Sequence, residues 1–508
     1  MTRLGFLLDS ESCIGCHACT VACKSEHDVP LGVNRTWVKY IETGSFPNVG
    51  RHFSVMRCNH CDDAPCMTIC PTSALHRTDN GVVDFQDDDC IGCKACMNAC
   101  PYDALYINPT TNTANKCNFC NHRLEIGLEP SCVVVCPTEA IKVVDLDDST
   151  DPVNAIIARE DVAVRAPEQN TKPKVFYRGA DQASLDPTRT AIAADGMIWA
   201  DTTPHHPTVP ATEARLDPEV VARTAYTTSH KPTWDLMVSG YLTTKAVAGG
   251  IMLVAALLVL LGHAQEQAAV GIAPPVVAGV FLAVTGVLLV GDLKQPGRFI
   301  YLLTRSNWSS WLVKGAYVLG SFAAFCAAWF IAGVADSTAT VTVLALPTAL
   351  LGAATAGYTA FLFAQCEGRD LWQTPLLLPL LLARAVVAGA AAYLVLAAVM
   401  TVPSERAIMW CLLGGVAAVG LLTVVELAAH GSRHVELAVR SMVRGGQRHW
   451  FAVGVALGVV VPAALAIVAL AADSTAPALL LAMAIPAIAG VFAAETAFVR
   501  AGQAVPLS

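Results

Sequence analysis

The second half of the chain is a succession of apolar segments separated by short polar breaks. Each segment from Leu236 onward has about 20 residues or more, enough to cross a hydrocarbon layer of about 30 Å. The segments are apolar on all sides, whereas the helices of a large soluble all-helical protein keep a polar outer face. The pattern predicts an all-α integral membrane domain of eight transmembrane helices over residues 236–508. The expected spans are 237–262, 272–291, 309–334, 340–364, 375–400, 408–429, 450–472 and 477–499.

The first half contains no comparable apolar segment. Residues 1–145 hold dense groups of cysteines and form the first expected domain. Residues 146–235 are rich in Pro, Asp and Thr at both ends and carry no persistent helical stripe. We therefore expect an extended linker or arm there, with short ordered pieces such as Lys174 to Tyr177. The apolar run after Met1 is too short for a signal peptide, and no twin arginine accompanies it.

Composition and charge sharpen this division. The chain is 54% hydrophobic and only 15% charged, which excludes a disordered chain and argues against a single soluble domain. Residues 1–235 carry 20 Lys and Arg against 31 Asp and Glu, whereas residues 236–508 carry 13 against 10. The acidic first half lacks the basic surface that nucleic acid requires, so no nucleic-acid partner is expected.

Sixteen of the 19 cysteines lie between Cys13 and Cys136, in four groups. A C-x2-C-x2-C turn lets three thiolates reach three irons of one cubane cluster, and a further cysteine three residues later serves a different cluster. At four thiolates per cluster, sixteen cysteines predict four [4Fe–4S] clusters. Zinc would not explain the fourth cysteine or the trailing proline, and disulfides would need an oxidising compartment. The groups are Cys13, Cys16, Cys19 and Cys23; Cys58, Cys61, Cys66 and Cys70; Cys90, Cys93, Cys96 and Cys100; and Cys117, Cys120, Cys132 and Cys136.

These groups resemble the electron-transfer subunit of dimethyl-sulfoxide-reductase-type molybdoenzymes. The resemblance covers roughly residues 5–145 and includes the stretches Met56 to Cys61, Cys90 to Cys96 and Asn115 to Cys120. It implies an α+β, bis-ferredoxin-like iron–sulfur domain in which the outer motifs pair with each other, as do the inner ones. It also implies a separate catalytic subunit with a molybdenum or tungsten bis-pterin centre. Carried over by position, the ligand sets are Cys13/Cys16/Cys19/Cys136, Cys23/Cys117/Cys120/Cys132, Cys58/Cys61/Cys66/Cys100 and Cys70/Cys90/Cys93/Cys96.

The apolar half resembles the quinol-interacting membrane subunits of polysulfide reductase and its relatives. The stretches that carry this resemblance are Gly291 to Phe299, Asn307 to Gly315, Gly368 to Gln373, and Val425 to Leu427 with His430. Those subunits have eight helices, and in that family the iron–sulfur protein and the membrane anchor are usually separate chains. The sequence is therefore similar to a natural fusion of the two.

Several ionisable residues fall inside the predicted spans, where charge is costly and usually marks a substrate or proton path. A quinone needs an apolar slot, a donor at each carbonyl and a group that exchanges protons with water. We expect menaquinone or ubiquinone to be the exchangeable substrate. The alternative is that these charges are packing pairs or interface charges. The residues expected to line the site are Lys245, Asp292, Tyr241 and Tyr358, with Glu426 as a proton relay.

The basic residues of the loops predict an orientation. Eight or nine of them, depending on where the last span ends, lie on the side of the N-terminal domain, against Arg406 on the other side. Lys and Arg concentrate in cytoplasmic loops, which places the iron–sulfur domain on the cytoplasmic face of a bacterial or archaeal inner membrane. The basic residues on that side are Lys294, Arg298, Arg305, Arg369, Arg433, Arg440, Arg444, Arg448 and Arg500.

Together these patterns predict the electron-transfer and membrane-anchor subunit of a molybdopterin-type oxidoreductase complex. Electrons would pass through the clusters between the quinone pool and a separate catalytic subunit. Membrane lipid would surround the anchor helices. An alternative is a redox-driven ion-translocating module, which would need ionisable groups through the full depth of the membrane. Another is a cluster-bearing sensor or scaffold, which would need no quinone site.

Overall fold

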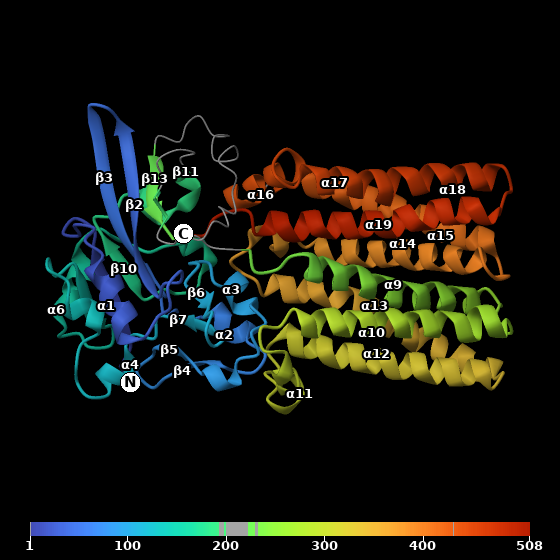
Figure 1. Cartoon of the computed structure of the whole chain (residues 1–508), viewed down its shortest axis with the longest axis horizontal. Coiled ribbons are helices and arrows are strands. Elements are labelled where there is room, and N and C mark those ends of the chain that lie inside the picture. The colour runs from blue at the N-terminus through green and yellow to red at the C-terminus, as the bar shows by residue number, and fades with distance from the viewer. Residues whose placement is uncertain (1, 193–197, 200–221, 229–231, 430) are drawn as a thin grey trace.

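The computed structural model describes residues 2–192, 198–199, 222–228, 232–429 and 431–508, which form two parts (Figure 1). A mixed α and β part, here called the cysteine-rich domain, contains residues 2–192, 198–199 and 222–228. A bundle of long helices, here called the helix bundle, begins at Leu236. The C-terminal end of the chain returns from the bundle to the cysteine-rich domain (Figure 1). The predicted fold class is confirmed.

Short helices carry the cysteine motifs, and they pack in two pairs. Helix α1 contacts α5, and α2 contacts α3. The first and fourth motifs therefore lie together, as do the second and third. Two small hairpins, β4–β5 and β6–β7, follow the helices of the inner pair. The bounds are α1 (Ala18–Glu26), α2 (Pro65–Ile69), η1 (Asp87–Asp89), α3 (Ala95–Ala99), α4 (Asn121–Leu124), α5 (Ser131–Val134), β4 (Leu75–Arg77), β5 (Val83–Phe85), β6 (Leu105–Ile107) and β7 (Ala114–Lys116).

Two larger sheets surround these motifs. One has the strand order β8-β1-β10-β9, and the other has the order β11-β13-β2-β3 with β12 beside β13. The strands β2 and β3 form a long hairpin that projects from the domain (Figure 1). The bounds are β1 (Leu4–Asp9), β2 (Thr36–Ser45), β3 (Asn48–Arg57), β8 (Ile141–Asp145), β9 (Val162–Ala163), β10 (Val175–Arg178), β11 (Thr190–Ile192), β12 (Ile198–Trp199) and β13 (Ala222–Thr227).

The segment predicted as a linking arm is integrated into these sheets where the structure describes it. Strand β10 pairs in parallel with β1, so that Val175 lies opposite Phe6, and neither side chain is exposed to solvent. This burial explains why residues beyond 145 belong structurally with the cysteine motifs. His205 and His206 lie outside the described residues. The other elements of the arm are α6 (Pro152–Arg159), η2 (Pro167–Gln169), α7 (Gln182–Leu185) and η3 (Pro187–Arg189).

The described part of the helix bundle has eight helices long and apolar enough to span a membrane, as predicted. Two spans contain a π-helical turn, η4 before α10 and η7 between α17 and α18. The bounds are α9 (Leu236–Leu260), η4 (Gln267–Ile272), α10 (Ala273–Gly291), α12 (Trp311–Val334), α13 (Thr338–Ala364), α14 (Leu377–Ala397), α15 (Glu405–Ala428), α17 (Arg448–Val455), η7 (Ala456–Val460), α18 (Val461–Ala471) and α19 (Pro477–Gly502). The short helices at the rim are η5 (Pro296–Arg298), α11 (Tyr301–Thr304), η6 (Asp370–Gln373) and α16 (Arg433–Val443).

Helices α9 and α14 form the centre of the bundle. In their apolar stretches 83% and 72% of the residues are buried, against 22–39% in the other six spans. The two central helices cross closely at Gly250, where an added Cβ would lie 1.8 Å from the carbonyl oxygen of Ala385. The outer helices expose large aliphatic side chains such as Val287, Ile331 and Leu346. Apolar surface of this extent suits lipid rather than water.

The cysteine-rich domain sits on one end of the bundle through backbone and charged contacts. The amides of Lys294 and Gln295 donate to the carbonyls of Gly92 and Ile91, at 3.1 and 3.2 Å. Gly92 has φ +67, and a Cβ there would lie 2.6 Å from the side chain of Lys294, so this close approach requires glycine. The motif loops are therefore seated directly on the loop that follows α10.

The acidic run before Cys90 takes part in this contact. Arg298 donates to the carbonyl oxygen of Asp87 at 2.7 Å, and Arg305 forms an ion pair with Asp89. Three consecutive aspartates would ordinarily form a solvated loop, but here the basic loop between α10 and α12 lies opposite them.

Candidate functional site

The inner cysteine motifs surround two separate cavities. One is lined by Cys70, Cys90, Cys93 and Cys96, here called the membrane-proximal set. The other is lined by Cys58, Cys61, Cys66 and Cys100. These are the two groups of four that the family resemblance assigns to single clusters. In each group, three cysteines come from one motif and the remaining one comes from its partner motif, because α2 and α3 pack together.

The chemistry of these cavities suits iron–sulfur clusters. Burial, followed by the neighbouring thiols of Cys100 and Cys58, raises the pKa of Cys66 well above its usual value. Burial and the neighbouring thiols act in the same direction on the pKa of Cys96. Such thiolates need cations to compensate their charge. Four cysteines line each cavity, three from one motif and one from its partner, which is the interleaved arrangement that ferredoxin-type clusters use.

The outer motifs bring their cysteines together in the same way. Cys13 interacts electrostatically with Cys16 and Cys136, and we call Cys13, Cys16, Cys19 and Cys136 the distal set. Cys23 interacts with the remaining members of its expected set, Cys117, Cys120 and Cys132.

A buried arginine lies between the two outer sets. Arg57 is fully buried, stacks over Phe6 at 4.4 Å, and donates a hydrogen bond to the sulfur of Cys132 at 3.4 Å. Burial opposes its charge, but the thiolates of Cys132, Cys117 and Cys19 outweigh that effect and raise its pKa. Hydrogen bonds to ligand sulfurs and nearby charge are the means by which a protein sets cluster potential.

The distal set reaches the surface of the cysteine-rich domain. Cys16 is exposed, whereas the set lined by Cys58 and Cys66 is buried. Exposed apolar side chains occur in the motif loop and in the paired helices α1 and α5: Ile14, Val21 and Val134. Exposed apolar side chains in the motif that carries an exposed cysteine, and in the helices beside it, are typical of a surface that a partner covers.

The membrane-proximal set contacts the helix bundle through two side chains beside Cys93. The ammonium of Lys94 lies 2.8 Å from the carboxylate of Asp292, which ends α10. The indole of Trp234 donates to the carbonyl oxygen of Cys93 at 3.2 Å. Asp292, one of the predicted quinone residues, therefore lies at the junction of the two parts.

Three further predicted residues lie on two adjoining helices. The ammonium of Lys245 on α9 is 4.3 Å from the ring centroid of Tyr358 on α13 and donates to the hydroxyl of Thr359. Tyr241 is buried one turn before Lys245, on the same face of α9. Gly315 of α12 makes room for Tyr358, since a Cβ there would lie 2.3 Å from the tyrosine ring.

Glu426 lies apart from this group. It is on α15, which packs on α14, and it accepts a hydrogen bond from Thr374 at 3.1 Å. A buried ion pair joins Arg384 of α14 to Glu495 of α19 at 3.0 Å. The structure thus brings Lys245, Tyr241 and Tyr358 together and leaves Glu426 on a neighbouring helix.

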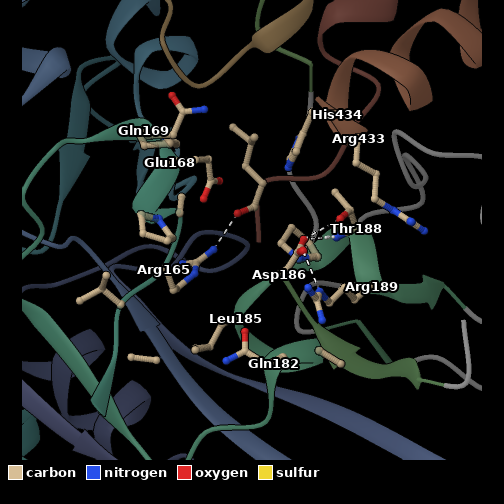
Figure 2. A pocket seen from close by; sticks show the side chains of 18 of the residues that line it. Arg165, Glu168, Gln169, Gln182, Leu185, Asp186, Thr188, Arg189, Arg433 and His434 are labelled. Carbon is tan, nitrogen blue, oxygen red and sulfur yellow. Dashed lines mark hydrogen bonds and ion pairs between the residues drawn. The ribbon is translucent and has the colours of Figure 1, made fainter. Parts of the chain in front are cut away.

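A large cavity of about 1110 Å³ opens where the arm, the rim of the bundle and the C-terminal segment meet (Figure 2). Figure 2 shows Arg165 reaching the backbone of this segment, where it donates to the carbonyl oxygen of Leu507 at 2.6 Å. Its wall carries both acidic and basic side chains, including Asp186 and Arg189, which are paired at 3.2 Å. None of the residues predicted to bind clusters or quinone lines the described wall of this cavity.

Comparison with known families agrees with this architecture. Residues 12–75 and 49–146 each match a 4Fe-4S dicluster domain, and residues 225–506 match the family described as "Polysulphide reductase, NrfD". The last match covers more than half of the chain. The chain belongs to the polysulphide reductase NrfD family. In this NrfD-family chain, the dicluster domains precede the membrane part within one polypeptide, which confirms the predicted fusion.

Individual relatives resemble about a third of this NrfD-family chain. The iron-sulfur subunit of an arsenate respiratory reductase from Shewanella sp. (strain ANA-3) is 36% identical in an alignment of 225 positions that covers 34% of this chain and 95% of the relative. A tetrathionate reductase subunit from Salmonella typhimurium is 40% identical over 36% of this chain and 76% of its own length. A polypeptide of the polysulfide reductase from Wolinella succinogenes is 38% identical over 34% of this chain and 93% of its own length.

Sequence reasoning missed four residues of the NrfD-family chain that the structure places at these sites. Lys94 pairs with Asp292, and Trp234 donates to Cys93. Arg57 donates to Cys132, and Thr359 accepts from Lys245. Position offered a signal for three of them: Lys94 lies inside the third motif, Arg57 directly precedes Cys58 of the second, and Trp234 lies just before the first span. Nothing in the pattern distinguishes Thr359 from other polar residues.

Proposed function

We propose that this chain carries electrons between a membrane quinone and a separate catalytic subunit, using four [4Fe–4S] clusters. When bound, such clusters accept and release single electrons. The observation that carries the proposal is the placement of the cysteine sets. The membrane-proximal set touches the helix bundle through Cys93 and Lys94, and the distal set reaches the opposite surface at Cys16.

The proposed quinone site is lined by Lys245, Tyr241, Tyr358 and Asp292. The ammonium of Lys245 and the tyrosine hydroxyls provide donors for the quinone carbonyls, in surroundings that are otherwise apolar. Asp292 is placed to exchange protons because it adjoins the charged junction with the cysteine-rich domain. Glu426 is proposed as a relay further along the proton path. Menaquinone and ubiquinone both have the carbonyl pair that these donors require.

The proposed partner covers the apolar patch around Cys16. The names of the relatives describe subunits of arsenate, tetrathionate and polysulfide reductases, which supports a catalytic partner subunit. The molybdenum or tungsten bis-pterin centre proposed for that partner follows from the resemblance of the cysteine motifs to dimethyl-sulfoxide-reductase-type subunits. The patch formed by Ile14, Val21 and Val134 provides the apolar contact that such a complex needs.

A quinol-reduction assay tests the electron-transfer proposal. The purified chain, reconstituted with iron and sulfide and placed in lipid nanodiscs, is mixed anaerobically with menaquinol or ubiquinol. Because the membrane-proximal set adjoins the proposed quinone site, we expect the visible absorption of the clusters to decrease after quinol is added. Dithionite reduction provides the end point. Full bleaching by dithionite with none by either quinol would contradict the proposal.

We also propose that the cysteine-rich domain faces the cytoplasm of a bacterial or archaeal inner membrane, because the basic rim lies on its side of the bundle. Single cysteines introduced at Asp336 and Arg444, which are exposed at opposite ends of the bundle, report this orientation. In spheroplasts an impermeant maleimide is expected to label Asp336→Cys directly and Arg444→Cys only after lysis. The parent chain controls for native thiols, and the reverse labelling order would overturn the orientation.

A further inference from the structure

A glutamine near the end of the chain clamps the segment that leads into α9. The residues Thr233 and Trp234 lie just before Asp235, the N-cap of α9, and Trp234 is 3% exposed. The side-chain oxygen of Gln503 accepts hydrogen bonds from both of their amides, at 2.9 and 3.1 Å. Its side-chain nitrogen donates to the carbonyl oxygen of Trp234 at 2.7 Å. This clamp fixes Trp234 relative to the end of α19.

The same two residues bind the third cysteine motif. The indole N–H of Trp234 donates to the carbonyl oxygen of Cys93, at 3.2 Å. The side-chain amide of Asn98 donates to the hydroxyl of Thr233 at 2.7 Å. The membrane-proximal set is therefore anchored to the junction on both sides of Cys96.

On its other side Trp234 belongs to an aromatic group that reaches into the bundle. Its ring stacks on Phe363 of α13 at 5.8 Å and on Trp372 of η6 at 5.6 Å, with interplanar angles of 22° and 20°. Phe363 and Trp372 stack on each other at 4.6 Å. Phe363 is five residues after Tyr358, so the group adjoins the proposed quinone site along one helix.

We propose that Trp234 is a positioning residue for electron exchange between the membrane-proximal set and the quinone. The inference rests on the proposed function. Its indole N–H polarises the peptide group between Cys93, a proposed cluster ligand, and Lys94. This polarisation stabilises the more negative, reduced state of the cluster. Its ring fills the space between the Cys93 loop and α13, which keeps the two redox partners close and excludes water.

Two substitutions separate these roles. Trp234→Phe keeps an aromatic ring but removes the N–H donor, whereas Trp234→Leu removes both. We expect Trp234→Phe to lower the midpoint potential of the membrane-proximal cluster in an EPR-monitored titration while quinol still reduces it. We expect Trp234→Leu to slow quinol-driven cluster reduction about tenfold or more, with unchanged iron content and quinol KM. Trp308→Leu is the matched control, because Trp308 lies at the same rim and stacks on Tyr317 at 4.7 Å.

The outcomes distinguish this inference from the proposed function. Quinol that fails to reduce the wild-type clusters contradicts the proposed function, and the potential of Trp234→Phe then decides the positioning role alone. The inference is overturned if quinol reduces the clusters of wild type and of Trp234→Leu at the same rate, and the midpoint potential of the membrane-proximal cluster is unchanged in Trp234→Phe. If Trp234→Leu loses iron, Trp234→Phe still decides: an unchanged potential counts against the positioning role, and a lowered one supports it.

Discussion

Replacing Lys245 with methionine is expected to abolish reduction of the clusters by quinol while leaving the clusters assembled. Lys245 is buried within the bundle, and its ammonium group contacts both Tyr358 and Thr359. Methionine retains the length and apolar volume of the side chain but removes its proton donor. The loss of a positioned donor typically costs a factor of about 10²–10⁴ in rate. Stopped-flow bleaching by quinol measures the effect, and dithionite reduction measures the clusters that remain.

Lys314→Met is the matched control for this prediction. Lys314 is also in a membrane span, but its ammonium lies over the ring of Trp311, at 4.7 Å, near the start of α12. We expect this variant to react with quinol at nearly the wild-type rate. Equal and complete loss in both variants would point to disruption of the bundle, and normal reduction of Lys245→Met would remove this residue from the quinone site.

The second large effect concerns the order of the clusters. A Cys90→Ala/Cys96→Ala variant removes two proposed ligands of the membrane-proximal set and, with four four-iron clusters, is expected to lose about four of about sixteen irons per chain. Quinol should then reduce none of the remaining clusters, because this set is the one that contacts the bundle through Cys93 and Lys94. Dithionite should still reduce them. Iron analysis and bleaching by the two reductants give the result.

Replacement of two cysteines in the distal set provides the comparison. Cys13→Ala/Cys16→Ala removes two ligands of the distal set, which lies at the exposed surface. Quinol should still bleach the remaining clusters of this variant. If both double variants respond alike to quinol, the proposed sequence of electron transfer from the membrane to the distal surface is wrong.

The membrane spans were predictable because length and apolar composition decide them almost alone. Each helix from α9 to α19 that crosses the bundle follows an apolar run visible in the sequence. The relative rotation of these helices was not visible. Depth along each span placed Lys245 and Tyr358 at the same level, but their contact depends on glycine at position 315 of a third helix.

The cysteine motifs were predictable for a different reason, since their spacing reflects the geometry of a cluster. The strand partners of β1 were not, because β10 is only four residues long and pairs with a strand some 170 positions earlier in the chain. A short apolar run of this kind gives no local signal of its partner. The same holds for the three aspartates before Cys90, whose arginine partners follow α10.

The ion pair between Arg305 and Asp89 has a thermodynamic consequence that depends on the chain being continuous. Both side chains are partly exposed, and such pairs contribute about 0–1 kcal/mol, too little to hold two separate proteins together. Within one polypeptide, however, the domain meets the bundle at an effective concentration on the order of millimolar. At that concentration the contacts of the junction together need only a Kd well below a millimolar, or somewhat more than about 4 kcal/mol, for near-full occupancy. The ratio of electron carrier to membrane anchor then stays at one to one however little of the protein a cell makes.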